Sequence, residues 1–399
     1  MPGVLDGIRV LDFGRYIAGP YCACLLGDLG AEVIRIEKLA GSEDRHQLPL
    51  GQTGPETNAG GALYIPMNRN KLGMTLNPMK DKGREIVKKL VATADVVVAN
   101  LPPATLKAMG LDYESLTAVK PDIILTTVSA YGEGPYSERV GFDGIGQVMS
   151  GAAYMSGRPG DPMKLAAPWV DFGTASLTAF GTLAALMERQ KTGRGQIVEG
   201  ALLHTAVAFS NATLLEQAVL GLDREAMGNR GWAAGPVDIV KCKDGFIIVQ
   251  VIGQPLFERW AKLMGEEDKW LNDPRFKDDL ARGDNGEILS ARMAEWCAER
   301  TQAEALAEME AARVPGGPLL SPQQALDDPH IQASGMLHPT ETPGLDKAAP
   351  VVRTPVKLST TPAEMKRRAP TLGEHTEEIM VSLGYAADEI AALRAERVI

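Results

Sequence analysis

Residues 8–37 read IRVLDFGRYIAGPYCACLLGDLGAEVIRIE, and this stretch decides the fold class. Its first part, residues 8–13, is a short apolar run rich in β-branched side chains, which is typical of a buried strand. Residues 20–29 carry apolar side chains at helical spacing, and Gly30 follows them where a helix commonly ends. Residues 32–37 repeat the first apolar pattern. We therefore predict a strand–helix–strand unit.

The alternation of strands and helices continues beyond this unit. Residues 81–93 have the pattern of an amphipathic helix, and residues 95–99 and 123–128 are further apolar runs. Strands that are apolar on both faces and alternate with helices indicate a parallel sheet covered by helices on either side. The predicted fold class is therefore α/β, with a Rossmann-like parallel sheet.

The turn after the first strand carries no nucleotide fingerprint. Residues 14–20 read GRYIAGP instead of the glycine pattern of dinucleotide-binding folds, and the chain has no lysine-containing phosphate loop of the Walker type. A Rossmann-like sheet without its fingerprint says little about its ligand. We therefore do not expect NAD or ATP as a cofactor.

The middle of the chain differs from its first third. Residues 171–189 are dense in Gly, Ala, Ser and Thr, which permits close approach of a neighbouring backbone, and residues 196–209 resume an apolar, largely buried pattern after a break. Residues 237–251 are predicted to form a hairpin around Asp244 and Gly245, because Asp-Gly favours tight turns. Further helices are expected at residues 255–265, 290–312, 376–383 and 387–396.

Composition and charge exclude several classes of protein. Among the 399 residues, 45% are hydrophobic and 23% charged, which is enough for a large folded core. The net charge of −10 and the lack of a long basic run argue against a nucleic-acid partner. No apolar run approaches 18 residues, and the N-terminus has no signal-peptide pattern, so we expect no membrane span. The four cysteines lack metal-ligand spacing, which favours free thiols, no bound metal and a cytoplasmic location.

Few side chains are candidates for acid–base or nucleophilic chemistry. The five histidines are scattered, so carboxylates become the candidates, and Asp171 is the foremost because it opens the small-residue helix. The alternative is that Asp171 only caps this helix, since aspartate accepts hydrogen bonds from the free amides there. In either role we expect its carboxylate to stay ionised. Turn formation explains Asp143 and Glu133 about as well as catalysis does. Five basic side chains could meet phosphates, although a solvated surface charge is the default explanation for each: Arg15, Lys38, Arg69, Lys71 and Lys107.

Several segments, present in one order, carry a family resemblance. They are GIRVLDF (7–13), AGPYCACLLGDLGAEVIRIEK (18–38), NRNKLGMTL (68–76), ADVVVANLPPATLKAMGLDYESL (94–116), PDIILTTVSAYGEGPYSERVGFD (121–143), VDFGTA (170–175), TGRGQIVE (192–199), KCKDG (241–245) and LGEHTEEIM (372–380). Over nearly its whole length the chain resembles the family III CoA-transferases, the CaiB/BaiF family. Any single segment would be a weak signal, and their shared order makes the resemblance specific.

The resemblance implies an architecture and a set of substrates. Family members form interlocked homodimers, in which each subunit is an open ring threaded through the other. Their large, Rossmann-like domain binds CoA and is built from both chain ends. Transferred to this chain, residues 1–220 form the N-terminal part of the large domain, residues 221–325 a smaller α/β domain, and residues 326–399 the return segment and C-terminal helices. The implied substrates are an acyl-CoA and a small carboxylic acid, without a permanently bound cofactor.

The resemblance also implies roles for single residues. The catalytic aspartate of the family falls on Asp171, whose carboxylate would attack the donor thioester, form a mixed anhydride, and then carry CoA as an aspartyl thioester. A basic residue at the adenosine phosphates corresponds to Lys38, and the wall near the pantetheine end includes Ser129 and Tyr131. All positions that contact CoA correspond here to Ile17, Ala18, Lys38, Leu76, Met79, Lys80, Asn100, Leu101, Lys107, Ser129 and Tyr131.

Two departures from family patterns bear on the substrate and on rival functions. Members that use formate and oxalate have a glycine-rich lid where residues 230–236 read RGWAAGP, and Trp232 suggests a larger or more apolar acyl group. The related 2-methylacyl-CoA racemases place a histidine where this chain has Phe142, which cannot move a proton. A third possibility is a non-catalytic subunit that binds acyl-CoA, and the intact Asp171 argues against it.

Overall fold

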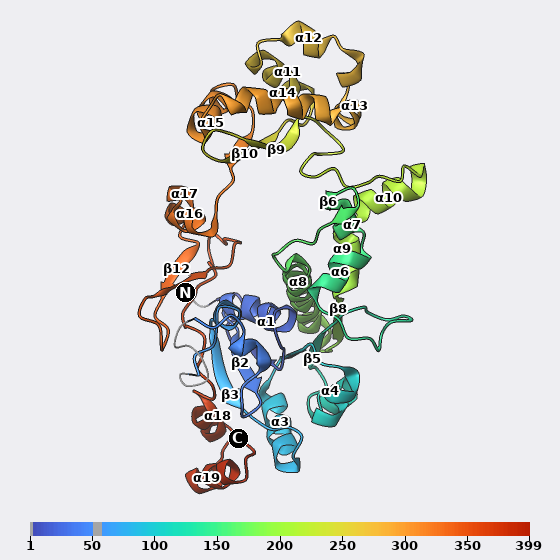
Figure 1. Ribbon diagram of the computed structural model, residues 1–399. Helices are drawn as coiled ribbons and strands as arrows, with labels where there is room; N and C mark the ends of the chain where they lie inside the picture. Colours follow the sequence, from blue (N-terminus) through green and yellow to red (C-terminus); the bar gives the residue numbers. More distant parts are fainter. Residues whose placement is uncertain (1–2, 51–57) are drawn as a thin grey trace. The chain divides into compact units, whose positions relative to one another are not determined.

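The chain divides into two compact units. In the computed structural model, residues 3–50 and 58–399 are described (Figure 1). The larger unit contains Met1–Ser150, Leu165–Ala212 and Gln332–Ile399, and the smaller contains Gly151–Lys164 and Thr213–Ile331. These limits differ from the expected boundaries after residues 220 and 325. Residues 151–164 belong to the smaller unit, where the amide of Gly228 donates a hydrogen bond to the carbonyl of Gly157 (2.7 Å).

The larger unit is built on a six-stranded sheet. Its strands lie in the order β3-β2-β1-β4-β5-β8, and every neighbouring pair is parallel. Val10 is paired with Val33 on one side and Val96 on the other, so β1 lies at the centre of the sheet. The strands are β1 Arg9–Asp12, β2 Glu32–Glu37, β3 Lys71–Thr75, β4 Val96–Ala99, β5 Ile124–Ser129 and β8 Ile197–Ala201. This arrangement confirms the predicted Rossmann-like parallel sheet.

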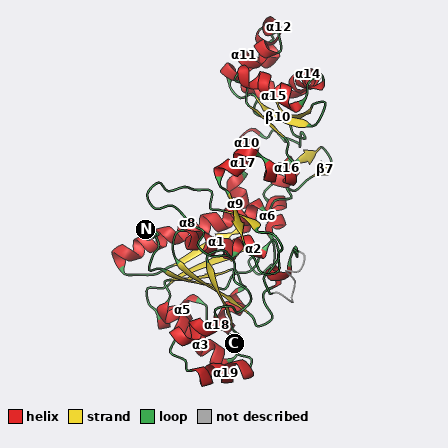
Figure 2. Cartoon of the chain, turned by 90° about the vertical axis from the view of Figure 1, so that its left-hand side faces the viewer, coloured by secondary structure: helices red, strands yellow, loops and turns green. Residues whose placement is uncertain are grey.

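Helices cover both faces of this sheet (Figure 2). Successive strand residues point to opposite faces, so Val10 packs in a cluster with α1 and α8, and Leu11 packs in another with α3, α5, α18 and α19. The helices of the larger unit include α1 Ala18–Asp28, η1 Glu43–His46, α2 Tyr64–Met67, α3 Asp81–Thr93, α4 Pro103–Met109, α5 Tyr113–Val119, α6 Asp143–Met149, α8 Trp169–Thr192, α9 Leu202–Phe209, α18 Thr376–Ser382 and α19 Ala387–Ala395.

The C-terminal segment completes the larger unit at the edge strand β3. The amide of Gly73 donates to Nδ1 of His375 (3.0 Å), and the amide of Thr75 donates to Oγ1 of Thr376 (3.0 Å). These bonds satisfy the amides of a strand that has no neighbour on that side. The large unit is therefore assembled from both ends of the chain, and β12 Leu337–Thr340 pairs with β13 Ala349–Val352 in the returning segment.

Helix α8 is the central helix of the larger unit. By length and composition α8 would suffice to cross a membrane, which differs from the expectation that no segment of the chain is long and apolar enough. Half of its apolar window is buried within the protein, where α8 packs against α1 and against strands β5 and β8. A side chain at Gly173 would collide with Phe209, and one at Gly181 with Val198, so the small residues do permit close approach as predicted.

One predicted segment has a different structure. Residues 196–209, expected to be apolar and largely buried, form strand β8 and then helix α9, and Ile197, Val207 and Phe209 among them are exposed. The strand forms by pairing with β5, in which Leu125 is opposite Ile197 and Ser129 is opposite Ala201. The turn before β8 is confirmed, because Gly193 ends α8 in a left-handed conformation (φ 69°).

The smaller unit contains an antiparallel sheet in the order β11-β10-β9 covered by helices. The predicted hairpin is confirmed, with Phe246 opposite Lys241 at the Asp-Gly turn. The expected helix at residues 290–312 is two helices, because Thr301 forms a capping box that starts a new one. The elements of this unit, with α10 and α17 crossing its borders, are α7 Ala152–Met155, β6 Gly157–Arg158, β7 Asp161–Pro162, α10 Asn211–Leu220, β9 Val237–Lys241, β10 Phe246–Gln250, α11 Gln254–Leu263, α12 Glu267–Leu271, η2 Pro274–Phe276, α13 Asp279–Asp284, α14 Gly286–Ala298, α15 Gln302–Ala311, β11 Gly316–Pro318, α16 Pro322–Asp327 and α17 Pro329–Ser334.

Candidate active site at the start of helix α8

Asp171 lies in the first turn of α8, as its third residue. The residue at the N-cap position is Pro168, and no side chain of the helix itself caps this end. Asp171 is half-buried. The alternative in which Asp171 serves as the N-cap of this helix is therefore wrong, and its carboxylate is not used for capping.

Another carboxylate caps the helix instead. Oδ2 of Asp143, the first residue of α6, accepts hydrogen bonds from the amides of Val170 (2.9 Å) and Asp171 (3.0 Å). These are two of the four amides that the first turn of a helix leaves free. The sequence left turn formation and catalysis open for Asp143, and its role in capping the start of α8 was missed. Only the tertiary contact between α6 and α8 reveals it.

The surroundings of Asp171 change its ionisation. Burial raises the pKa of Asp171 to about 7, and the negative charge of Asp143 adds to this rise. The expectation that the helix N-terminus would keep this carboxylate fully ionised therefore holds only in part, because a group with a pKa of about 7 is divided between its two protonation states at neutral pH. The backbone amide of Asp171 donates to Asp143 and so does not stabilise the charge of the Asp171 side chain. A carboxylate with a pKa near neutrality in a partly buried position is a candidate for a functional role.

The start of α8 meets the first strand–helix turn of the sheet. Ala18, the first residue of α1, and Val170 belong to one apolar cluster with Val128 at the end of β5. The rings of Tyr16 and Phe142 meet edge to face with centroids 5.5 Å apart. Tyr16 has a positive φ of 61°, which non-glycine residues adopt rarely. The carboxyl ends of β1 and β5 and the beginnings of α6 and α8 therefore converge beside Asp171.

A cavity of about 240 Å³ opens at the carboxyl ends of the strands. Ligands of open parallel sheets bind at this edge, near the point where the strand order reverses, which here lies between β1 and β4. The lining includes four of the residues that the resemblance assigns to CoA, namely Lys38, Leu76, Met79 and Leu101. The structure therefore brings these four residues together.

The remaining predicted CoA contacts lie outside this lining. Ile17 is the N-cap residue of α1, and the side chain of Asn100 exchanges hydrogen bonds with the backbone of Arg15 (2.6 and 2.8 Å). Nζ of Lys80 donates to the carbonyl of Glu396 (2.5 Å), and Lys107 is exposed on α4. At the end of β5, Oγ of Ser129 accepts from the amide of Gly132, and the Tyr131 ring contacts Tyr136.

Two arginines that are not among the predicted CoA contacts, Arg15 and Arg35, also line the cavity. Arg35 is fully buried and forms ion pairs with Asp12 (3.5 Å) and Asp44 (3.2 Å). Arg15 and Lys38 both pair with Glu43. The sequence left a phosphate contact and a surface charge open for Arg15, and the structure places its partly exposed side chain at the cavity. Its place beside the cavity follows from the fold of the first turn.

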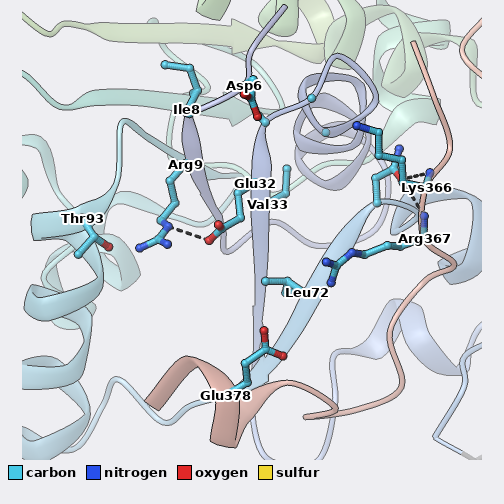
Figure 3. A pocket seen from close by; sticks show the side chains of 15 residues that line it. Asp6, Ile8, Arg9, Glu32, Val33, Leu72, Thr93, Lys366, Arg367 and Glu378 are labelled. Atoms are coloured by element: carbon cyan, nitrogen blue, oxygen red, sulfur yellow. Dashed lines mark hydrogen bonds and ion pairs between the residues drawn. The ribbon is translucent and has the colours of Figure 1, made fainter. Parts of the chain in front are cut away.

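A larger cavity lies at the opposite edge of the sheet. It measures about 740 Å³ and is lined by residues where the strands begin, including Arg9 and Glu32, and by the returning segment at Lys366 and Arg367 (Figure 3). Arg9 and Glu32 neutralise each other in an ion pair of 2.8 Å. None of the predicted site residues lines this cavity. Both the predicted CoA contacts and the geometry of the sheet therefore favour the smaller cavity, at the carboxyl edge, as the CoA site.

The described part of the chain offers no metal centre. Within residues 3–50 and 58–399, no group of three or more His, Cys, Asp or Glu side chains is placed to hold a metal ion. The four cysteines are buried free thiols, and burial raises the pKa of Cys22 and of Cys24 to about 12. A thiol that stays protonated is a poor nucleophile. Asp171 therefore remains the candidate nucleophile.

Comparison with known proteins places the chain in a family. The family model of CoA-transferase family III matches residues 5–376. The succinyl-CoA–D-citramalate CoA-transferase of Chloroflexus aurantiacus is 34% identical over 100% of this chain and 98% of its own length. A formyl-CoA:oxalate CoA-transferase of Rhodopseudomonas palustris is 31% identical over 98% of this chain and 96% of its own length. A crystal structure of a CaiB/BaiF family protein from Brucella suis matches with a TM-score of 0.82 and 30% identity, covering 96% of this chain and all of that one.

The chain therefore belongs to the family III CoA-transferases, the CaiB/BaiF family. It is an enzyme that transfers CoA from an acyl-CoA to a carboxylic acid acceptor.

Proposed function

We propose that Asp171 is the nucleophile of this transfer and that CoA binds at the carboxyl edge of the sheet. The observation that carries the proposal is a half-buried carboxylate, not used for capping, at the start of α8. The first strand–helix turn lies beside it. Backbone and side chains from several strand ends thus surround one reactive group, as in other parallel α/β enzymes.

The reaction proceeds in four steps. The Asp171 carboxylate attacks the carbonyl carbon of the donor thioester, the C–S bond breaks, and a mixed anhydride and CoA thiolate form. The thiolate attacks the aspartyl carbonyl, which releases the donor acid as a carboxylate and leaves CoA as an aspartyl thioester. The acceptor carboxylate attacks this thioester and forms a second anhydride and thiolate. The thiolate then attacks the acceptor's carbonyl, which releases the new acyl-CoA and restores Asp171.

The raised pKa suits Asp171 to this chemistry. A more basic carboxylate is a stronger nucleophile once it has lost its proton. With a pKa of about 7, a large share of Asp171 is ionised at neutral pH. No separate general base is required, because the attacking group carries its own charge.

The substrates we propose are a succinyl-type donor and a small dicarboxylic or hydroxy acid acceptor. The Chloroflexus relative is named for succinyl-CoA and D-citramalate, which are of this size. Trp232 lies in the segment of residues 230–236, which departs from the glycine-rich lid that marks formyl and oxalyl transfer in the resemblance. A bulky indole in that segment favours a donor larger than formyl. We also propose that the enzyme acts in the cytoplasm and holds no cofactor other than its CoA substrates.

We also propose that the enzyme is an interlocked homodimer. Three large apolar side chains lie exposed along one face of α8, namely Leu177, Phe180 (70% exposed) and Met187 (62% exposed). Helix α10 has no buried residue, although it carries Leu215, Val219 and Leu220. Exposed apolar surfaces of this kind favour coverage by a partner subunit. Native mass spectrometry at nanomolar concentration should show dimers only, since threaded rings cannot separate, and folded monomers would reject the threading.

A donor and acceptor screen tests the proposed function. Formyl-CoA, succinyl-CoA and a 2-methylacyl-CoA are each incubated with a panel of small carboxylic acids, and the acyl-CoA products are identified by mass. We expect exchange from succinyl-CoA, and its loss in Asp171→Ala with the circular dichroism spectrum preserved. Preference for formyl-CoA would reject the donor class alone. Exchange by Asp171→Ala at the wild-type rate would reject the nucleophile. Deuterium uptake at the α-carbon without acyl exchange would indicate a racemase, which Phe142 argues against.

A further inference from the structure

Helix α6 carries a buried pair of polar side chains that contacts residues 165–171, where α8 begins. Asp143 and Gln147 lie one helical turn apart, and only 9% and 2% of their surfaces are exposed. Buried polar side chains are costly unless their hydrogen bonds are satisfied. The partners of this pair therefore indicate what the pair holds in place.

The two side chains hold the chain at both ends of the segment that precedes Asp171. Oδ1 of Asp143 accepts from Nε2 of Gln147 (2.5 Å), and Oε1 of Gln147 accepts from the amide of Leu165 (2.9 Å). Oδ2 of Asp143 accepts from the amides of Val170 and Asp171. The path from Leu165 to Asp171 is thus attached to α6 at its beginning and at its end.

Packing makes this attachment close. A Cβ atom at Gly146 would lie 2.7 Å from Cγ1 of Val170, which real Cβ atoms do not tolerate. The absence of a side chain at this position lets α6 approach the first turn of α8. This close packing holds the carboxylate of Asp143 within hydrogen-bond distance of the amides of Val170 and Asp171.

The capping of α8 by Asp143 also limits the hydrogen bonds that the Asp171 side chain can form with its own helix. An aspartate in the first turn of a helix commonly turns back and accepts hydrogen bonds from the free backbone amides. Asp143 already occupies the amides of Val170 and Asp171 and places a negative charge beside them. The Asp171 carboxylate is thereby kept from folding back onto its own helix and is left free for a substrate.

We propose that Asp143, supported by Gln147, is a positioning residue of the transfer reaction, which fixes the first turn of α8 and keeps the Asp171 carboxylate directed at the thioester. This inference rests on the proposed role of Asp171 as nucleophile. Attack on a carbonyl requires the two reacting atoms to be aligned, and a misplacement of about 1 Å can cost about 100-fold in rate. Asp143 itself does not touch the reacting atoms in this account.

The pair permits a rescue experiment. Asp143→Asn keeps an oxygen that accepts from the two amides, but its amide group then faces the Nε2 donor of Gln147. Adding Gln147→Glu supplies an acceptor for that amide group and a second oxygen for the amide of Leu165. The double variant Asp143→Asn/Gln147→Glu thus restores the polarity between positions 143 and 147 and loses only the long bond from Nε2 of Gln147 to the carbonyl of Leu165 (3.4 Å), whereas Asp143→Ala removes the network. Asp112→Ala is the matched control, because Asp112 caps α5 by accepting from the amide (3.1 Å) and hydroxyl (2.6 Å) of Ser115.

The readouts are kcat, KM for succinyl-CoA and the melting temperature of each variant. For Asp143→Ala we expect kcat to fall about 100-fold with KM changed less than about threefold, because an alignment lost only in the transition state lowers kcat. The kcat of the double variant should be at least about tenfold higher than the kcat of Asp143→Asn alone. Asp112→Ala should lose a similar amount of stability and keep its kcat.

Several results would overturn the inference. Wild-type kcat in folded Asp143→Ala would do so, as would a loss of kcat in Asp112→Ala equal to that in Asp143→Ala. A double variant no faster than Asp143→Asn would reject the network, even if Asp143→Ala failed to fold. These outcomes are distinguishable from failure of the proposed function, which is decided by Asp171→Ala alone.

Discussion

Replacement of Asp171 by asparagine should stabilise the folded enzyme, and more so as the pH rises. An unfolded aspartate loses its proton near pH 3.8, whereas burial and the charge of Asp143 raise the pKa of Asp171 to about 7 in the folded state. Between these values the folded chain holds a proton that the unfolded chain has released. The free energy of unfolding contributed by this group therefore falls as pH rises from about 4 to about 7.

The size of the effect follows from the shift. About three pKa units correspond to about 4 kcal/mol as a ceiling. Asp171 is half-buried, and screening by solvent reduces this to about 1–2 kcal/mol. Asp171→Asn removes the ionisation and keeps the shape of the side chain. We expect its melting temperature in calorimetry to exceed that of the wild type by about 2–4 °C at pH 8. The difference should shrink towards zero as the pH approaches 4.

A control of opposite sign is available on α5. Burial acts to raise the pKa of Asp112, but hydrogen bonds from Ser115 outweigh it and lower this pKa. Its ionised form therefore stabilises the fold above the unfolded pKa, and that stability is lost as pH falls through the folded pKa. Asp112→Asn should accordingly lower the melting temperature at pH 8. If Asp171→Asn changed stability by the same amount at pH 5 and pH 8, a raised pKa of this half-buried carboxylate would be refuted.

Three further predictions concern binding, packing and rate. Lys38→Glu should weaken CoA binding in calorimetry by about tenfold, because a cation beside the cavity becomes an anion near the phosphates, and unchanged affinity would reject this placement. Gly146→Ala should cost about 1–3 kcal/mol of stability in urea unfolding. Gly144→Ala on the same helix, where a Cβ meets nothing within 4 Å, should cost much less, and equal losses would contradict the packing. The rate of Asp171 acylation in stopped-flow should rise with pH through about 7, and Asp143→Asn should move this limb to lower pH; an unmoved limb would contradict the charge effect.

The strands that could be predicted are those whose faces are both apolar. Residues 8–13 and 32–37 are apolar except for a few charged side chains. In the fold these side chains form ion pairs, such as Arg9 with Glu32 and Arg35 with Asp12. Strand β3 escaped prediction because it begins with Lys71, whose ammonium is buried against Asp12 (2.7 Å). Strand β8 was not predicted as a strand, because Glu199 and Gly200 interrupt its short apolar run. A side chain at Gly200 would collide with Thr178 of α8, a constraint that exists only in the folded chain.

The candidate site could be predicted in its residues but not in its environment. Asp171 was singled out from its position before a small-residue helix, and the structure places it at the start of α8. Its raised pKa and its cap by Asp143 depend on contacts between segments 28 residues apart, which no local pattern encodes. The cavity likewise unites strand ends that are distant in sequence, so the contribution of Arg35 could not be predicted.

The most direct test of the account is to identify the residue that carries CoA during turnover. The enzyme is mixed with succinyl-CoA alone, treated with hydroxylamine or borohydride, digested, and its peptides are analysed by mass. The account predicts that the modification lies on Asp171, as the hydroxamate or the reduced alcohol, and that it is absent from Asp171→Ala. A modification on any other residue, or steady CoA exchange without a modified peptide, would contradict it.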